Sequence, residues 1–466
     1  MTGPVQSPAQ ALTRSLDLEA LGAWIEGQRW YASKSRHVSA IEIEECALLV
    51  ERPPLLLALV AARFATGSHE LYQLPLTLLA PSQSNGRAEI VTNGEWVAVD
   101  SVADPERARD LLRRIDDGGE LEAEEGAFHF HRVEGSGALS RDASARPVGV
   151  EQSNSSIVFG EQTVLKVFRK LEPGINPELE LLQFLTRHGF ANIAPLLGWY
   201  DYEGRSFSAT LGVAQRFFPD AIGGWELALD QIGSDFEGLE AELGALGTVT
   251  AELHNVLGSD SSDPAFSSEE PSAESLALLT ATIDEDIERI FIRLPDDERV
   301  ASIAGRGQDV RERIAMRSQV GGGGRAIRTH GDFHLGQTLH TPRGWVIIDF
   351  EGEPARPLFE RRQKRSPLRD VASMLRSFAY ATSAMEIIRA RPAPPDFEDR
   401  ARRTFLEHYF STIDPALLPA GEAAVINLLT IFELEKAIYE LNYELDNRPD
   451  WLPIPVAGIA RLLESE

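Results

Sequence analysis

Two short stretches decide the fold: HGDFHLGQ at 330–337 and WVIIDFEGEP at 345–354. The first contains Asp332, which is followed five positions later by the amide side chain of Gln337. The second is an apolar run that predicts a buried strand and ends at a second carboxylate, Asp349, 349 − 332 = 17 positions after the first. One carboxylate can orient a hydroxyl group, while the other, together with an amide, can hold a metal ion through hard oxygen ligands.

The same order occurs in the phosphoryl-transfer pattern H-R-D-x-x-x-x-N followed by D-F-G. ATP carries several negative charges that a metal ion must neutralise, and a separate carboxylate must orient the attacking hydroxyl. We therefore predict Asp332 as the catalytic base, and Gln337 and Asp349 as ligands of Mg²⁺. A plainer interpretation is that each stretch only closes a turn. It fits either stretch alone, but the order, the spacing and the amide together favour catalysis.

A lysine upstream fits the same chemistry. TVLKVF at 163–168 alternates like a strand and contains Lys166, which is suited to contact the α/β-phosphates of ATP. The alternative is a surface lysine on an edge strand. The helix predicted from PELELLQFLTRHG supplies an ion-pair partner for this lysine, and we favour Glu180 over Glu178.

The expected glycine-rich phosphate loop is missing. GVEQSNSSIVFG at 149–160 offers Ser153, Asn154 and Ser155 instead, whose side chains and backbone N–H groups can cradle phosphate. By itself this stretch would be interpreted as an ordinary hairpin turn.

The composition limits the class of protein. A chain of 466 residues is long enough for two or three domains, and a net charge of −27 argues against wrapping nucleic acid or lying on an anionic membrane. The single cysteine excludes a cysteine-based zinc site, and no apolar run approaches the ~18 residues of a membrane span. We expect a cytoplasmic enzyme with a small-molecule substrate, as a monomer or a weak homodimer.

The pattern along the chain predicts an α+β protein. Apolar runs broken by turn residues indicate strands over 38–100 and 127–168, and helical periodicity dominates from about residue 225. We expect a cap over 1–95, a strand-rich lobe over 96–215 with the elements that bind the ATP phosphates, and a helical lobe over 216–466 with the catalytic and sugar-binding elements. ATP is expected between the two lobes.

Several blocks resemble the actinobacterial maltokinase family, which consists of sugar kinases with an aminoglycoside-phosphotransferase-like fold. The blocks are QRWYASKSR (28–36), EQSNSS (151–156), LKVFRKLEPGINPELE (165–180), ERRQKRSPLRDVASMLRSFAYA (360–381) and EKAIYELNYELDNRPDWLPIP (435–455), together with the two motifs quoted first. The resemblance implies a bilobal, protein-kinase-like fold with an N-terminal β-rich cap. It also implies ATP- and Mg²⁺-dependent phosphorylation of maltose to maltose 1-phosphate for α-glucan synthesis.

The resemblance also implies roles for individual residues. Asp332 would be the base, Gln337 and Asp349 the metal ligands, and Lys166 a phosphate ligand. The segment VAQRFFPDA at 213–221 resembles the family's hinge, in which Gln215 and Phe217 present backbone groups to adenine. Asp370 resembles the family's structural aspartate, which braces the catalytic loop.

The sugar site is expected on the helix over 424–446. Helical spacing places Glu433, Lys436, Glu440 and Glu444 on one face, which is either a sugar pocket or a solvated face with a Lys436–Glu440 pair. Both alternatives stay open here. We add Asp332, His334, Glu351 and Trp451 as candidate substrate contacts, and favour a loop-organising role for His334.

Other functions must be weighed against a maltose kinase. Relatives with the same catalytic blocks phosphorylate glucosamine to glucosamine 6-phosphate, and an acidic pocket would attract an amino sugar. The fold also supports phosphorylation of aminoglycosides, but the N-terminal β-rich region favours the sugar branch. A non-catalytic nucleotide-binding scaffold is a third class, and the joint presence of Lys166, Asp332, Gln337 and Asp349 argues against it.

Overall fold

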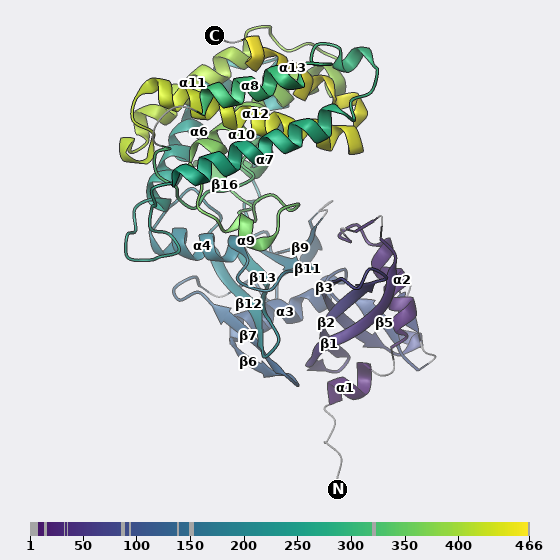
Figure 1. Cartoon of the computed structure of the whole chain (residues 1–466). Coiled ribbons are helices and arrows are strands. Elements are labelled where there is room, and N and C mark those ends of the chain that lie inside the picture. The colour runs from purple at the N-terminus through teal and green to yellow at the C-terminus, as the bar shows by residue number, and fades with distance from the viewer. Residues whose placement is uncertain are drawn as a thin grey trace. The chain divides into compact units, whose positions relative to one another are not determined.

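The chain divides into two compact units. The computed structural model describes residues 8–13, 16–31, 33–34, 36–84, 89–92, 95–137, 139–148, 153–318 and 323–464. Unit 1 comprises residues 1–186 and 194–219, and unit 2 comprises residues 187–193 and 220–466. Strands dominate unit 1 and helices dominate unit 2, which confirms the predicted α+β class (Figure 1).

Unit 1 contains two antiparallel sheets. Its helices are α1 (Pro8–Thr13), α2 (Leu18–Gly27), α3 (Pro105–Asp117) and α4 (Pro177–Arg187). Its strands are β1 (Val38–Glu51), β2 (Pro54–Phe64), β3 (His69–Leu79), β4 (Glu89–Thr92), β5 (Val97–Asp100), β6 (Gly119–Glu122), β7 (Gly126–Arg132), β8 (Ala145–Pro147), β9 (Asn154–Phe159), β10 (Thr163–Phe168), β11 (Lys170–Leu171), β12 (Leu196–Gly204) and β13 (Ser208–Arg216).

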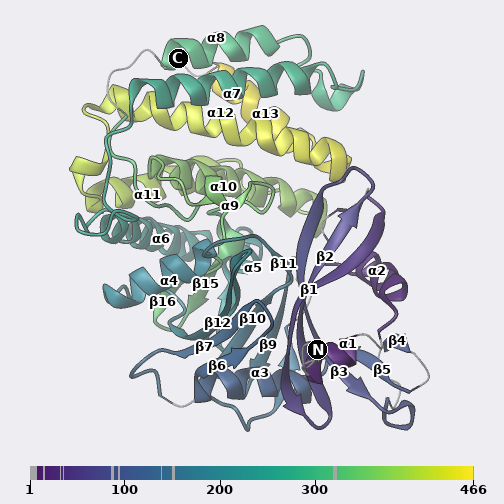
Figure 2. The ribbon, with the colours of Figure 1, turned by 60° about the horizontal axis from the view of Figure 1, so that its bottom comes forward.

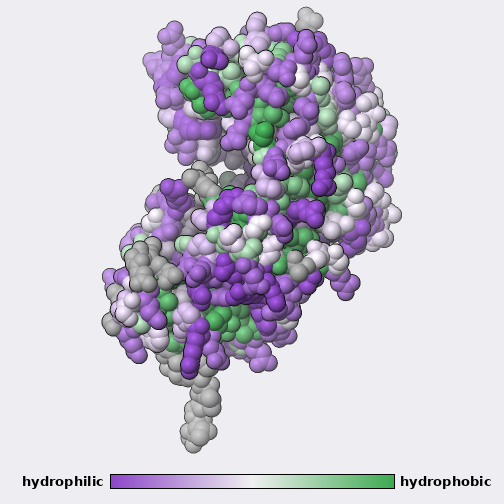
Figure 3. Space-filling view, turned by 180° about the vertical axis from the view of Figure 1, so that it is seen from behind, coloured by the Kyte–Doolittle hydropathy of each residue, from purple (hydrophilic) through white to green (hydrophobic). Residues whose placement is uncertain are grey.

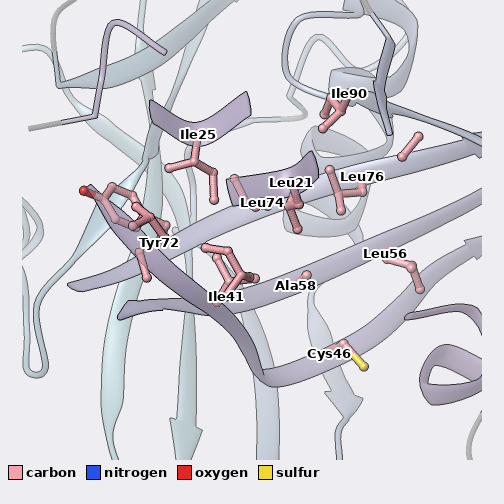
Figure 4. Close-up of a cluster of buried hydrophobic side chains, with 14 of the residues drawn as sticks. Leu21, Ile25, Ile41, Cys46, Leu56, Ala58, Tyr72, Leu74, Leu76 and Ile90 are labelled. Carbon is pink, nitrogen blue, oxygen red and sulfur yellow. The ribbon is translucent and has the colours of Figure 1, made fainter. Parts of the chain in front are cut away.

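The first sheet, which we call the cap sheet, has the order β1-β2-β3-β5-β4 among the residues described, and β11 also pairs with β3. Helix α2 begins at the side-chain cap of Asp17 and buries Leu21 and Ile25. Both pack into a cluster with Ile41 and Leu74 of the sheet (Figure 4). An apolar stripe on a short helix therefore covers one face of the cap sheet.

The second sheet has the order β6-β7-β12-β13-β10-β9-β8. Its strand β10 carries Lys166 and is bordered on both sides, by β13 and by β9. The edge-strand alternative for Lys166 is therefore wrong, because β10 is an internal strand.

Helix α3 begins after Asp104, whose side chain accepts a hydrogen bond from the N–H of Glu106.

Buried polar contacts join the two sheets within unit 1. The Gln73 side chain on β3 donates to the carbonyl oxygens of Phe168 (3.0 Å) and Leu211 (2.8 Å), and it accepts from the Tyr200 hydroxyl (2.7 Å). Arg169 Nη2 lies 2.6 Å from Asp100 Oδ2 at the end of β5. These contacts pair the Gln73 amide, the Tyr200 hydroxyl and Arg169 Nη2 with buried partners, while the buried Arg169 Nη1 has no hydrogen-bond partner among the described residues.

Unit 2 combines a small sheet with layered helices. Its elements are β14 (Ile222–Gly223), α5 (Gly224–Gln231), α6 (Phe236–Leu257), α7 (Ala273–Phe291), α8 (Gly307–Arg317), β15 (Thr338–Thr341), β16 (Gly344–Ile347), α9 (Leu358–Arg361), α10 (Leu368–Arg389), α11 (Phe397–Thr412), α12 (Glu422–Asn447) and α13 (Pro453–Glu464). The sheet order is β14-β15-β16.

Helix α12 has two differently packed faces. One face buries Leu434, Ile438 and Leu441 in a cluster to which α7, α8 and α13 contribute. Figures 1 and 2 show α7 and α8 running along α12, with α10 nearby. The other face carries the charged residues that the sequence singles out, so α12 presents them toward α10 and α11.

The surface is largely hydrophilic on the face that Figure 3 shows, in keeping with the net charge of −27. Among the residues described, the structure holds no helix with the length and apolar content required to cross a membrane.

Candidate active site

The loop at 330–337 is held in place by hydrogen bonds from its backbone N–H groups and from the His330 ring. The N–H groups of His330 and Gly331 donate to the two carboxylate oxygens of Asp370, at 2.8 and 3.0 Å. The His330 ring donates from Nε2 to the carbonyl oxygen of Ile348 (2.9 Å) and accepts at Nδ1 from the N–H of Asp332 (3.3 Å). Gly331 has a φ of +84°, a region that suits glycine, so the turn that aims Asp332 needs this residue.

Asp370 is a buried brace for this loop. Burial alone would raise the pKa of its carboxyl group. Hydrogen bonds from His254 and from the loop N–H groups outweigh burial and lower the pKa below its ordinary value. His254 is itself held by the Tyr409 hydroxyl at 2.9 Å. The carboxylate therefore stays ionised, and the expected bracing role of Asp370 is confirmed.

Gln337 and Asp349 lie side by side. The Gln337 amide donates from Nε2 to Asp349 Oδ2 at 2.9 Å. Asp349 lies two residues after the end of β16 and has a φ of +64°, a left-handed conformation that costs free energy in a residue other than glycine. The amide oxygen and the carboxylate supply hard oxygen atoms of the kind that Mg²⁺ prefers, so the two residues fit a magnesium site.

Asp332 is in contact with a lysine from a distant helix. Lys436 Nζ on α12 lies 3.2 Å from Asp332 Oδ1 and 2.8 Å from Glu353 Oε1. His334 Nε2 is 4.0 Å from Asp332 Oδ2, too far for a hydrogen bond, and its Nδ1 accepts from the N–H of Gly336 at 3.0 Å. His334 thus organises the loop, as we favoured.

Sequence reasoning missed Glu353. It lies in the motif that follows Asp349, but its partner Lys436 is 83 positions later, and neither residue carries a local signal of the other. Lys436 and Arg356 lower the pKa of Glu353 to about 2 against the opposing effect of burial. The Glu353 carboxylate is therefore charged at any working pH of the protein.

The charged face of α12 is buried rather than solvated. Glu433 pairs with Arg402 (2.9 Å), Glu440 with Arg376 (2.7 Å) and Glu444 with Arg448 (2.6 Å). The three carboxylates are 3%, 8% and 1% exposed. The solvated-face alternative is therefore wrong.

The Lys436–Glu440 pair that formed part of the solvated-face alternative is also wrong. Lys436 instead contacts Asp332 and Glu353, because the packing of α12 turns its side chain toward the catalytic loop. Trp451, a candidate substrate contact, stacks on Tyr380 with a ring separation of 6.1 Å, and the Arg448 guanidinium lies 4.7 Å from the Trp451 ring centre. Glu351 follows the metal-site residue Asp349, and its carbonyl oxygen accepts from Arg361 at 3.0 Å.

A cavity of about 50 Å³ opens beside the loop in unit 2. Its lining includes Gly331, Glu353, Arg356, Arg369 and Lys436. Pockets for small organic ligands usually measure about 300–1,000 Å³, so this cavity is too small to hold a sugar as it stands.

In unit 1, Lys166 forms a buried ion pair. Its Nζ lies 2.7 Å from Glu178 Oε2, with side-chain exposures of 11% and 1%. Our preference for Glu180 is therefore wrong. The reason is the rotation of the first turn of α4, in which Asn176 accepts from the N–H of Glu178 and the Glu178 side chain faces the buried side.

The other predicted nucleotide contacts of unit 1 are partly engaged. The Asn154 amide donates to Ser153 Oγ (3.2 Å), and Arg169 donates to Ser155 Oγ (2.8 Å). Residues 149–152 of this stretch lie outside the described residues.

Residues of the hinge segment also form hydrogen bonds within the protein. Gln215 lies on β13 with register partners on β10 and β12, and its side chain reaches the carbonyl oxygen of Ala194 at 3.4 Å. The N–H of Phe217 donates to the carbonyl oxygen of Gln162 at 2.8 Å. A contact of Phe217 with adenine would therefore use its carbonyl group, and such contacts stay a prediction.

Comparison with known proteins assigns families to two parts of the chain. Residues 24–104 match the maltokinase N-terminal cap domain, and residues 144–352 match the phosphotransferase enzyme family. A glucosamine kinase from Streptacidiphilus jiangxiensis is 28% identical over 334 residues, which cover 68% of this chain and 73% of that protein. A glucosamine kinase from Mycolicibacterium smegmatis (strain ATCC 700084 / mc(2)155) is 27% identical over 334 residues, which cover 68% of this chain and 79% of that protein.

Solved structures share the fold. A glucosamine kinase in crystal form B superposes with a TM-score of 0.71 at 20% identity, covering 96% of this chain and 99% of that chain. A glucosamine kinase in complex with glucosamine, ADP and inorganic phosphate gives a TM-score of 0.67 at 22% identity, covering 91% of this chain and 93% of that chain. The protein-kinase-like fold with an N-terminal β-rich region is thereby confirmed.

Proposed function

We propose that this chain, whose residues 144–352 match the phosphotransferase enzyme family and whose residues 24–104 match the maltokinase N-terminal cap domain, phosphorylates maltose at the anomeric hydroxyl. It is an ATP-dependent sugar phosphotransferase that uses a divalent metal ion. The observation that carries the proposal is the braced loop in unit 2. This loop presents Asp332 to an acceptor, while the adjoining hairpin presents Asp349 beside Gln337.

Each residue has a defined task in the proposed reaction. The Asp332 carboxylate accepts the proton of the sugar hydroxyl as that oxygen attacks the terminal phosphorus of ATP. Gln337 and Asp349 would hold Mg²⁺, and the bound ion would supply charge neutralisation for the phosphate oxygens. Lys166 in unit 1 contacts the nucleotide phosphates, and Glu178 fixes its ammonium group.

The buried face of α12 favours a neutral sugar. Glu433, Glu440 and Glu444 each form an ion pair with an arginine. The ammonium group of an amino sugar would have to displace Arg402 or Arg376 from a buried pair, and breaking such a pair costs roughly 3–5 kcal/mol. Maltose carries no charge, so its binding would not have to displace either arginine.

Glucosamine is the second candidate acceptor. The curated relatives named above are glucosamine kinases at 28% and 27% identity. Phosphorylation of glucosamine would fall on the 6-hydroxyl group and leave the reducing end intact, whereas phosphorylation of maltose at the anomeric hydroxyl removes the reducing end.

A single enzyme preparation tests the two candidates. We expect ATP-dependent ADP release with maltose, together with loss of reducing ends equal to the ADP formed. ADP release with glucosamine alone, and reducing ends retained, would assign the second function. The Asp332→Asn variant is the control that links turnover to this site, and a preparation that turns over neither sugar would contradict both candidates.

A further inference from the structure

We propose that Lys436, fixed by Glu353, is the positioning residue of the catalytic base. Its ammonium group holds Oδ1 of Asp332 and thereby leaves Oδ2 for the sugar hydroxyl. The inference rests on the proposed kinase function. It assigns to Lys436 a role in orienting the base, in place of the sugar contact that the helical pattern suggested.

The geometry limits where the Lys436 ammonium can be. Two carboxylate oxygens, one from Asp332 and one from Glu353, lie 3.2 and 2.8 Å from Nζ, and the side chain is 15% exposed. The ring centre of Tyr439 lies 4.9 Å from Nζ. The backbone of α12 is held by its apolar cluster on the opposite face, so the ammonium group has little freedom to follow a ligand.

The charges of the cluster favour this arrangement. Burial would lower the pKa of Lys436, but the carboxylates of Glu353 and Asp332 outweigh it and raise the pKa above its ordinary value. Arg356 also contacts Glu353, so that carboxylate is fixed from two sides. A permanent ammonium group can orient a base, whereas it cannot accept a proton from the substrate.

The proton balance of the reaction assigns separate roles to the two residues. The hydroxyl O–H bond breaks, its proton passes to Asp332, and the oxygen forms the new bond to phosphorus while ADP leaves. Lys436 keeps its three protons throughout. Within the loop 330–337, His334 is 4.0 Å from Asp332 and makes no hydrogen bond to it, so the cation that fixes the base comes from a residue 104 positions later.

The hydrogen-bond partners of Lys436 and the volume of the adjoining cavity both argue against a direct contact between Lys436 and the sugar. A lysine ammonium group has three N–H donors. Here two donors are directed at protein carboxylates, and the adjoining cavity of about 50 Å³ is smaller than the ~300 Å³ typical of a small-ligand pocket.

Kinetics of four variants test the inference. We expect Lys436→Met to lower kcat by about 10²-fold, the loss typical of a misplaced catalytic group, while KM for the sugar and the nucleotide affinity stay within about threefold. Lys436→Arg should recover about tenfold of that loss because it restores the cation. Glu353→Gln should lower kcat by about tenfold, since Arg356 retains part of the arrangement.

Lys364→Met is the matched control. Lys364 is similarly sheltered, with a side-chain exposure of 9%, and it contacts Glu269 and the carbonyl oxygen of Pro264 away from the loop. Its removal should leave kcat unchanged. Thermal melting and nucleotide binding of each variant establish that it is folded, and Lys436→Arg and Glu353→Gln carry the test if Lys436→Met does not fold.

Two kinetic results would overturn the inference: an increase in sugar KM with kcat unchanged, or equal kcat in Lys436→Met and the parent. If the parent turns over no sugar, the proposed function fails by itself. Crystal structures then decide the inference separately. A changed Asp332 side-chain torsion in Lys436→Met supports it, and an unchanged torsion rejects it.

Discussion

The backbone of Asp349 shows how one residue can connect folding and chemistry. A φ of +64° is costly for aspartate, yet the β15–β16 hairpin on one side and the turn at Gly352 on the other hold it there. This conformation places the carboxylate beside the Gln337 amide instead of continuing the strand. The hairpin therefore offsets the strain at this position, which places Asp349 where the proposed metal site requires it.

The first prediction concerns the base itself. Asp332→Asn should lower kcat by about 10²–10⁴-fold, because the amide cannot accept the hydroxyl proton, and it should leave nucleotide affinity unchanged. Coupled ADP release and calorimetric ATP binding measure the two quantities. Asp396→Asn, at the start of α11, is the surface control, and a variant at position 332 with full turnover would remove Asp332 from the mechanism.

The second prediction concerns pH. Glu353 has a pKa of about 2 in the folded protein against an ordinary value of 4.5. Its contribution to the free energy of unfolding, on the order of 3 kcal/mol, is therefore present above about pH 4.5 and is lost as the pH falls toward 2. Glu353→Gln should be less stable at pH 7 and should lose less stability between pH 5 and pH 2.5. Urea unfolding at each pH measures this, and parallel curves for parent and variant would contradict it.

For helix α12, the sequence predicted which residues lie on each face, but it did not predict what covers the charged face. Helical periodicity correctly separates the charged positions from the apolar ones, because a spacing of 100° per residue depends on sequence alone. It does not reveal that Arg402 of α11 and Arg376 of α10 cover the charged face, since these partners are set by tertiary packing. The same limit explains why Glu178, and not the favoured Glu180, pairs with Lys166. The rotation of the first turn of a helix is set by the elements against which it packs.

The proximity of Gln337 and Asp349 was predictable for the opposite reason. Asp332, Gln337 and Asp349 lie within one local stretch, so order and spacing carry most of their geometry. Glu353 and Lys436 are joined only when α12 packs beside the loop, and no local pattern encodes that contact.

The third prediction concerns the packing of α13 against α10. A methyl group on Gly458 would lie 2.0 Å from Nη1 of Arg376, whose guanidinium pairs with Glu440. Gly458→Ala should therefore destabilise the protein by about 1–3 kcal/mol, the usual cost of overpacking. Denaturant titration measures the change. The control is Gly27→Ala, whose methyl group would meet no atom within 4 Å, and equal stability of the two variants would show that Arg376 can move aside.

At the scale of the whole molecule, the junction between the two sheets of unit 1 explains why the cap sheet and the second sheet form one compact unit. Strand β11 pairs with β3 of the cap sheet, at Lys170 opposite Tyr72, only two residues after β10 ends. The strand that carries Lys166 therefore continues directly into the edge of the cap sheet. Turn and strand signals predict both sheets but not this pairing, because it joins segments about 100 residues apart.

The fourth prediction removes the polar centre of this junction. Gln73→Leu would deprive two carbonyl oxygens of their donor and Tyr200 of its acceptor, all in a fully buried region. Unsatisfied buried groups cost roughly 1–3 kcal/mol each, so we expect a loss of several kcal/mol in unfolding free energy. The midpoint of urea unfolding checks this against Gln83→Leu, on a surface turn, and equal midpoints would show that water fills the gap.

The buried contact between Arg169 and Asp100 has a consequence for the ancestry of such chains. A junction closed by a buried arginine–aspartate contact and a shared strand edge cannot be divided without leaving an unpaired charge in the interior, which is costly. A descendant that lost the cap would therefore have to replace Arg169 as well. We therefore expect related chains to retain or to lose the cap and the strand that bears Lys166 together.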